Sequence, residues 1–202
     1  MTPTRELEAE VRKRAGDGAL YIAGVDEVGV GALAGPVIAA AVVLHEDVEL
    51  TGDSKQLTHA QREAAFEVIR TVAVAIGIGH ISPMQIDAAG IARARERAIL
   101  KAFAACRRKL NAVPGAVHAR LAAVVDDHRL GRLRSQLGGQ CSIFADKADE
   151  RSVSVAAASI IAKVVRDRYM TRVGLFYQGY NFANNNGYGT PQHLAALREL
   201  GP

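Results

Sequence analysis

Apolar and polar positions follow two different periods along this chain. Short apolar runs, two of which end in acids, predict strands, and longer stretches with an apolar residue every third or fourth position predict helices. The predicted strands cover residues 20–26, 37–44, 72–80, 121–126 and, as a short fifth, 141–145. The predicted helices cover residues 5–14, 59–71, 83 to about 110, 152 to about 173, and 191 to about 201.

Two helix starts carry a specific signature. Ser82-Pro83 and Thr190-Pro191 each place a capping hydroxyl before a proline, which suits the first turn of a helix. Gly90 is a candidate interruption of the helix that begins at Pro83. The order of elements predicts a single α/β domain over residues 1–202, with helices packed on a mixed five-stranded sheet. The glycine-rich turn after the first strand is too short for a crossover helix, so the first two strands should be antiparallel.

Composition fits a soluble globular protein. The 202 residues are 49% hydrophobic and 23% charged, and the net charge of +4 permits a polyanionic partner without requiring one. Residues 28–45 carry no charge, but their glycines and proline leave only eight unbroken apolar residues, which indicates a buried strand and no membrane span. The N-terminus resembles no secretion signal. Cys106 and Cys141 match no ligand spacing, so we expect reduced thiols in a cytoplasmic protein.

Acidic residues collect where the predicted strands end. Asp26 and Glu27 follow the first strand and precede a glycine-rich turn, whose amides could approach a phosphate. Acids at strand ends can also be solvated caps, and acids before a helix can simply favour its N-terminus. Because no cysteine or histidine cluster accompanies them, these carboxylates favour Mg²⁺ or Mn²⁺ over Zn²⁺. The other acids of this kind are Asp126, Asp127, Asp146 and Asp149.

Other polar residues have ordinary alternatives. Ser159 and Lys163 share a face of the alanine-rich helix, and so do Lys163 and Asp167, but a solvated helix face has the same spacing. Lys55 lies in a segment that also fits a simple turn. His193 is expected at the surface of the last helix, and no histidine neighbours a serine or cysteine nucleophile, so serine hydrolase chemistry has no support.

Several segments together resemble one family over residues 7–201. The segments are AGVDEVGVGALAGPVIAAAVVL, DSKQLT, VVDD, KADERSVSVAAASIIAKVVRDRYM and GYGTPQHL, in this order. They resemble ribonuclease HII, the bacterial type 2 ribonuclease H. The resemblance implies a ribonuclease H-like fold and metal-dependent hydrolysis of RNA in RNA–DNA hybrids, with incision 5′ to ribonucleotides embedded in duplex DNA.

The resemblance also implies site residues. Asp26, Glu27, Asp126 and Asp149 match the family's catalytic and metal-binding acids, with Asp127 and Asp146 as rivals to the last two. Asp26 and Glu27 are adjacent, so sharing one site should need a twist or bulge in the strand. Two Mg²⁺ or Mn²⁺ ions are expected during catalysis, giving 3′-hydroxyl and 5′-phosphate ends. The substrate-binding candidates are Gly29, Val30, Gly31, Lys55, Ser159, Lys163 and Tyr188.

The chain departs from the family pattern at several positions. Val30 stands where the family has an arginine, Asn186 where a lysine is usual, and Asp127 where a glycine is usual. Two basic phosphate contacts are therefore absent, and the chain stops at Pro202 before the family's usual tail. Two other functions remain open: a hybrid-specific nuclease that ignores single ribonucleotides, as in ribonuclease HIII, and a non-catalytic hybrid-binding protein. The expected partners are RNA–DNA hybrid and ribonucleotide-containing duplex DNA, bound by a monomer.

Overall fold

Five strands form one mixed sheet at the centre of the protein. The computed structural model describes residues 2–16, 18, 20–50 and 57–202. The strand order is β3-β2-β1-β4-β5; β2 is antiparallel to both of its neighbours, and β1, β4 and β5 are parallel to one another. This arrangement confirms the expected mixed sheet and the antiparallel first pair. The strands are β1 (Leu20–Val28), β2 (Val37–Leu44), β3 (Ala73–Ile81), β4 (Arg120–Asp126) and β5 (Ile143–Ala145).

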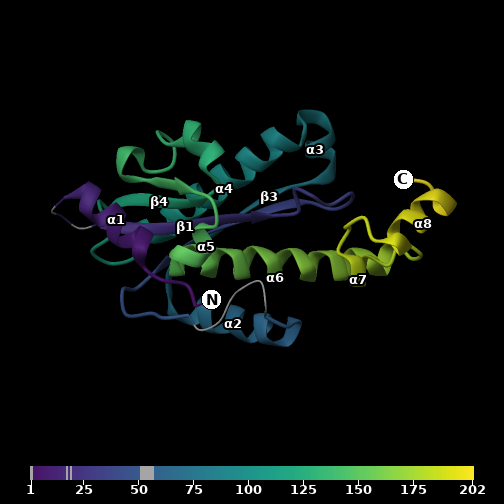
Figure 1. Cartoon of the computed structure of the whole chain (residues 1–202), viewed down its shortest axis with the longest axis horizontal. Coiled ribbons are helices and arrows are strands. Elements are labelled where there is room, and N and C mark those ends of the chain that lie inside the picture. The colour runs from purple at the N-terminus through teal and green to yellow at the C-terminus, as the bar shows by residue number, and fades with distance from the viewer. Residues whose placement is uncertain (1, 17, 19, 51–56) are drawn as a thin grey trace.

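Helices cover both faces of this sheet. Figure 1 shows the sheet between α4 on one side and α6 on the other, with α2 packed outside α6 and the C-terminal α8 at the far end of α6. The helices are α1 (Glu6–Ala15), α2 (His59–Val72), α3 (Pro83–Ala89), α4 (Ile91–Asn111), α5 (Ala148–Arg151), α6 (Val153–Phe176), α7 (Phe182–Asn185) and α8 (Pro191–Leu200), with 3₁₀ turns η1 (His128–Leu133) and η2 (Gly139–Cys141).

The predicted helix starts are present. The hydroxyl of Ser82 accepts a hydrogen bond from the amide of Gln85, and Thr190 caps α8 in the same way. Gly90 has a φ of 80° and separates α3 from α4, so the interruption expected there is real. The sequence did not predict α5, α7 or the 3₁₀ turns, because elements of three to six residues are too short to show a period.

Alternate residues of each inner strand face different helices. Ala23 and Val25 of β1 pack in the core beneath α4, whereas Ala40 and Val42 of β2 pack beneath α6. Every residue of β2 is buried because helices cover both faces of that strand. A Cβ added to Gly24 would lie 2.0 Å from the backbone carbon of Ser154, so α6 contacts β1 directly. This alternation decides the direction of the acids that follow along β1.

Two expectations from composition can be compared with the described residues. None of the helices within them has the length and apolar character needed to cross a bilayer. Cys106 and Cys141 are both free thiols, one buried and one half-buried.

Candidate active site

Three of the predicted acids lie at one edge of the sheet. Asp26 and Glu27 occupy the last third of β1, and Asp126 is the last residue of β4. The two strands are parallel, with Val25 beside Val125, so Asp26 and Asp126 follow as neighbours. Because the carboxyl ends of parallel strands meet at the same edge, residues a hundred positions apart form one acidic cluster.

The acids are divided between the two faces of the sheet. Asp26 follows the alternation of Gly24 toward α6, and Glu27 follows that of Val25 toward α4. The strand has no bulge between them, since Asp26 pairs with Ala40 and Glu27 with Ala39 in unbroken register. The two side chains therefore leave the strand on opposite faces, yet the charge of Glu27 still raises the pKa of Asp26.

Asp26 lies in an environment that opposes its charge. Burial, followed by the neighbouring charges of Glu27 and Asp126, raises the pKa of Asp26 from 3.8 to about 8. Hydrogen bonds from the Ser159 side chain and from the backbone amide of Glu27, the latter 2.8 Å long, offset this only in part. Ser159, a substrate-binding candidate, thus contacts a carboxylate of the cluster.

Glu27 has an arginine partner that the sequence did not indicate. The Nε of Arg95, in α4, donates a 2.7 Å hydrogen bond to Oε1 of Glu27, and Nη1 of Arg95 donates one of 2.7 Å to Oδ2 of Asp127. Burial still raises the pKa of Glu27 despite this arginine. Arg95 stands in the charged stretch RARERAILK and has no local signal that separates it from its exposed neighbours Arg93 and Arg97.

Asp126 is joined to the short helix that carries Asp149. The amide of Ala148 donates a 2.8 Å hydrogen bond to Oδ1 of Asp126, and Asp149, the next residue, is only 5% exposed.

Asp127 instead packs on the α4 side, where its oxygens accept hydrogen bonds from Arg95 and Arg129. Although burial opposes it, these bonds hold the pKa of Asp127 below its ordinary value. Asp126 and Asp127 therefore have different surroundings, although they are adjacent in the sequence.

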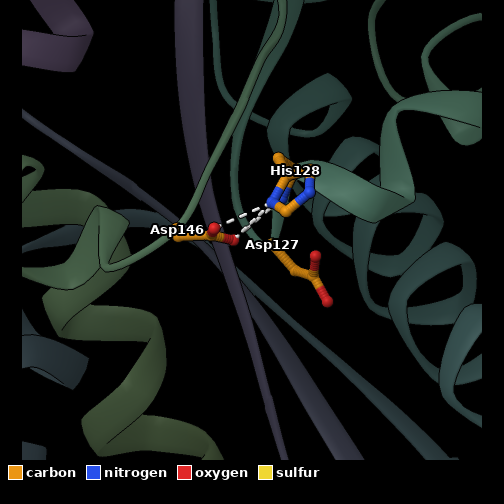
Figure 2. A group of neighbouring side chains, drawn as sticks. All are labelled: Asp127, His128 and Asp146. Atoms are coloured by element: carbon orange, nitrogen blue, oxygen red, sulfur yellow. Dashed lines mark hydrogen bonds and ion pairs between the residues drawn. The ribbon is translucent and has the colours of Figure 1, made fainter.

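A second group of possible metal ligands lies beside the cluster. Oxygen or nitrogen atoms of Asp127, His128 and Asp146 come within 4.8 Å of one another. Figure 2 shows the His128 ring facing the Asp146 carboxylate, at 2.8 Å, while the Asp127 carboxylate points away from this pair. His128 and Asp146 are more than 60% exposed. Asp127 already binds Arg95 and Arg129. We therefore interpret His128 and Asp146 as an exposed ion pair that lies beside the ion pairs of Asp127.

The glycine-rich turn is joined to the segment that carries Tyr188. The amide of Leu33 donates a 2.8 Å hydrogen bond to the carbonyl of Gly187. Buried Arg166 of α6 binds both segments, because its guanidinium donates to the carbonyls of Pro36, Ala34 and Asn186 at 3.0, 3.0 and 2.7 Å. Gly29 has a φ of 99°, and an added Cβ would meet Arg166 at 2.5 Å. Sequence reasoning missed Arg166, since a helix arginine gives no sign that it binds backbone carbonyls.

Tyr188 lies above two basic side chains. Lys163 Nζ is 5.8 Å and Arg166 Cζ 5.3 Å from the centre of its ring. Lys163 also forms the expected pair with Asp167, at 2.7 Å. The expectation that His193 is a surface residue is wrong: it is fully buried, and its Nδ1 lies 2.9 Å from the carbonyl of Tyr188.

The remaining substrate-binding candidates have simpler positions. Val30 is 37% exposed, and Gly31 beside it has open space where a Cβ would be. The segment Gly52–Lys55 lies outside the described residues, and so the prediction for Lys55 cannot be placed.

The donor set fits a hard divalent cation. The carboxylates of Glu27 and Asp126 lie close enough for their charges to raise the pKa of Asp26, and Glu27 is paired with Arg95. Oε2 of Glu27 is buried and has no hydrogen-bond partner in the described part of the chain. Carboxylate oxygens without sulfur or nitrogen ligands are the set that Mg²⁺ and Mn²⁺ prefer.

Comparison with known proteins places the chain in a family. The sequence profile described as Ribonuclease HII matches residues 23–202. A ribonuclease HII of Listeria innocua is 46% identical over 183 residues, which are 90% of this chain and 64% of the relative, so the chain spans less than two thirds of that protein.

Solved structures agree with the sequence comparison. The structure of a PCNA:RNase HII complex from Archaeoglobus fulgidus matches with a TM-score of 0.68 and 28% identity, covering 89% of this chain and 87% of that one. The ribonuclease H2 of Pyrococcus horikoshii matches with a TM-score of 0.62 and 27% identity, covering 89% and 86%. The expected ribonuclease H-like fold is thereby confirmed, and the chain belongs to the ribonuclease HII family.

Proposed function

We propose that this chain is the catalytic domain of a divalent-metal-dependent endoribonuclease. Its substrates are RNA–DNA hybrids and duplex DNA with embedded ribonucleotides, which it cuts 5′ to the ribonucleotide. The observation that carries the proposal is the partly buried cluster of Asp26, Glu27 and Asp126 in a chain of this family. A protein that only bound nucleic acid would gain from losing negative charge beside phosphates.

The ion would be held by Asp26, Glu27, Asp126 and Asp149. When bound, two Mg²⁺ or Mn²⁺ ions would activate a water for in-line attack and stabilise the leaving 3′-oxygen, so that the products would carry 3′-hydroxyl and 5′-phosphate ends. The hydrogen bond from Ala148 orients the Asp126 carboxylate, and Ser159 orients that of Asp26. No nucleophilic side chain is needed for this reaction.

The substrate would be read by the glycine-rich turn and Tyr188. The amides of Gly29 and Gly31 are suited to the 2′-hydroxyl, which distinguishes RNA from DNA. Tyr188 would stack on the sugar, and Lys163 beneath its ring supplies a positive charge near the backbone phosphates. Val30 adds no charged contact, so recognition would rely on backbone amides more than on side chains.

Cleavage of a labelled duplex with a single embedded ribonucleotide tests the proposal. We expect one cut 5′ to the ribonucleotide in Mg²⁺ or Mn²⁺, none in EDTA, and none in an all-DNA duplex of the same sequence. Cutting of a long hybrid alone would favour the hybrid-specific nuclease. Binding without cutting in either metal would favour the non-catalytic alternative.

The assembly and location follow from the same proposal. We propose that the chain acts as a monomer in the cytoplasm, where reduced thiols such as Cys106 and Cys141 are stable. Light scattering at the concentrations used for cleavage measures the first point, and a mass above that of one chain would contradict it.

A further inference from the structure

One arginine lies inside the acidic cluster and has no part in the proposed reaction. Arg95 projects from α4 to the ends of β1 and β4, and its side chain is 17% exposed. Its partners, Glu27 and Asp127, are 10% and 7% exposed. We call these three residues the Arg95 clamp. Its positive charge belongs to the protein and lies beside Glu27, a carboxylate that the proposed function assigns to a metal cation.

The clamp holds Arg95 in one orientation. Nε and Nη2 of Arg95 contact the same oxygen of Glu27, Oε1, at 2.7 and 2.6 Å, and Nη1 contacts Oδ2 of Asp127 at 2.7 Å. Three nitrogens of one planar group are therefore bound by two carboxylates on the α4 side of the sheet. Oε1 of Glu27 is bound by Arg95, while Oε2 is buried and has no hydrogen-bond partner among the described residues.

Asp127 has a strained backbone conformation. Its φ of 135° lies in a region that residues with a side chain rarely adopt. The backbone amide of Arg129 donates a 2.8 Å hydrogen bond to Oδ1 of Asp127, and Oδ2 accepts from Nη1 of Arg95 at 2.7 Å and from Nε of Arg129 at 3.2 Å. A strained residue whose carboxylate is held by Arg129 in this way keeps the guanidinium of Arg95 against Glu27.

We propose that Arg95, held by Asp127, is a built-in counter-cation of Glu27 that competes with the divalent ion for this carboxylate. The proposal rests on the proposed function, since the competing ion is the cofactor of that reaction. Binding of a divalent ion to Glu27 is less favourable while the charge on its Oε1 is neutralised by the Arg95 guanidinium. The protein should therefore bind these ions more weakly than its number of carboxylates suggests.

Calorimetric titration of the protein with Mn²⁺, without nucleic acid, tests the competition. We expect Arg95→Met to bind Mn²⁺ about tenfold more tightly or better, because a unit positive charge 2.6 Å from Oε1 of Glu27 is removed. Arg93→Met removes an exposed arginine from the same helix and should change the affinity less than about twofold. Weaker binding by Arg95→Met would mean that the arginine prepares Glu27 for the ion, and would overturn the proposal.

A double variant separates competition from net charge. Arg95→Met/Asp127→Asn removes one charge of each sign, and it also avoids leaving Asp127 buried without Arg95 if the single variant folds poorly. Competition predicts that the double variant still binds Mn²⁺ several-fold more tightly than the unchanged protein. Equal affinity would show that only the net charge matters, and would contradict a direct contest for Glu27.

The titration can be interpreted without the nuclease assay. If Arg95→Met gains Mn²⁺ affinity while no variant cuts a ribonucleotide-containing duplex, the proposed function fails and the competition stands. If the unchanged protein cuts the duplex and Arg95→Met gains no affinity, the competition fails and the function stands. Absence of Mn²⁺ binding in every variant would remove the ion with which Arg95 is proposed to compete, and would overturn the inference.

Discussion

The amide of Ala148 donates a 2.8 Å hydrogen bond to Oδ1 of Asp126. This bond joins the end of β4 to the four-residue helix α5, in which Asp149 is the next residue. Asp127, one position further, points to the opposite face and binds Arg95 and Arg129. The two adjacent aspartates therefore differ in surroundings, and the predictions for them differ as well.

We expect Asp126→Asn to lower cleavage by more than about 100-fold, since an amide cannot hold a divalent ion as a carboxylate does. Asp127→Asn should keep most of the activity but lower the free energy of unfolding by about 1–3 kcal/mol, because it weakens buried hydrogen bonds to two arginines. Initial cleavage rates and urea denaturation measure the two effects. If Asp127→Asn were the more damaging change to cleavage, the assignment along β4 would be off by one residue.

Without metal, stability should fall as pH rises through the range set by Asp26. Its pKa is about 8 in the folded protein and ordinarily 3.8, so between these values the folded form keeps a proton that the unfolded form releases. The free energy of unfolding then decreases with pH, by up to about 1.4 kcal/mol per unit from this group.

The matched variant for this prediction is Asp26→Asn. Having no proton to lose, it should show a shallower fall and be the more stable protein at pH 8 in EDTA. Added Mg²⁺ should stabilise the unchanged protein at pH 8 and have little effect on Asp26→Asn. Denaturation curves from pH 5 to pH 8 provide the measurement, and parallel curves for the two proteins would refute the role given to Asp26.

Val30→Arg should tighten binding of a duplex with one embedded ribonucleotide and steepen its salt dependence. One added phosphate contact changes the slope of log affinity against log salt by about one unit. The cut position should not move, because the amides of Gly29 and Gly31 do not depend on that side chain. Val68→Arg, at an exposed position on α2, adds the same charge elsewhere and serves as the control. An unchanged slope would place residue 30 away from the backbone of the substrate.

Tyr188→Ala should weaken binding of the same duplex by about 1–3 kcal/mol, the usual range for a lost stacking contact. Tyr188→Phe should keep most of the affinity, because the ring over Lys163 and Arg166 remains. Equilibrium binding in Ca²⁺, which replaces the catalytic ions, measures both variants. Equal losses for the two would assign the effect to the hydroxyl and contradict stacking.

Local patterns of the sequence predict much of the fold. The apolar run 37–44 matched β2 to the residue, and the capping pairs at Ser82 and Thr190 marked the starts of α3 and α8. These features depend on neighbours within a few positions, through side-chain alternation and capping hydrogen bonds. The placement of acids at strand ends follows from the same local signals, since parallel strands bring their carboxyl ends together.

The partners of those acids were decided by tertiary structure alone. Nothing near Arg95 in the sequence distinguishes it from Arg93, and only the packing of α4 against β3, where an added Cβ on Gly79 would lie 1.9 Å from the Ala98 carbonyl oxygen, brings it to Glu27. The burial of His193 likewise depends on how α8 packs against the Tyr188 segment. Local sequence determines which residues form a strand or helix. Contacts between layers depend on how closely the backbones approach each other, and no short stretch of sequence determines that distance.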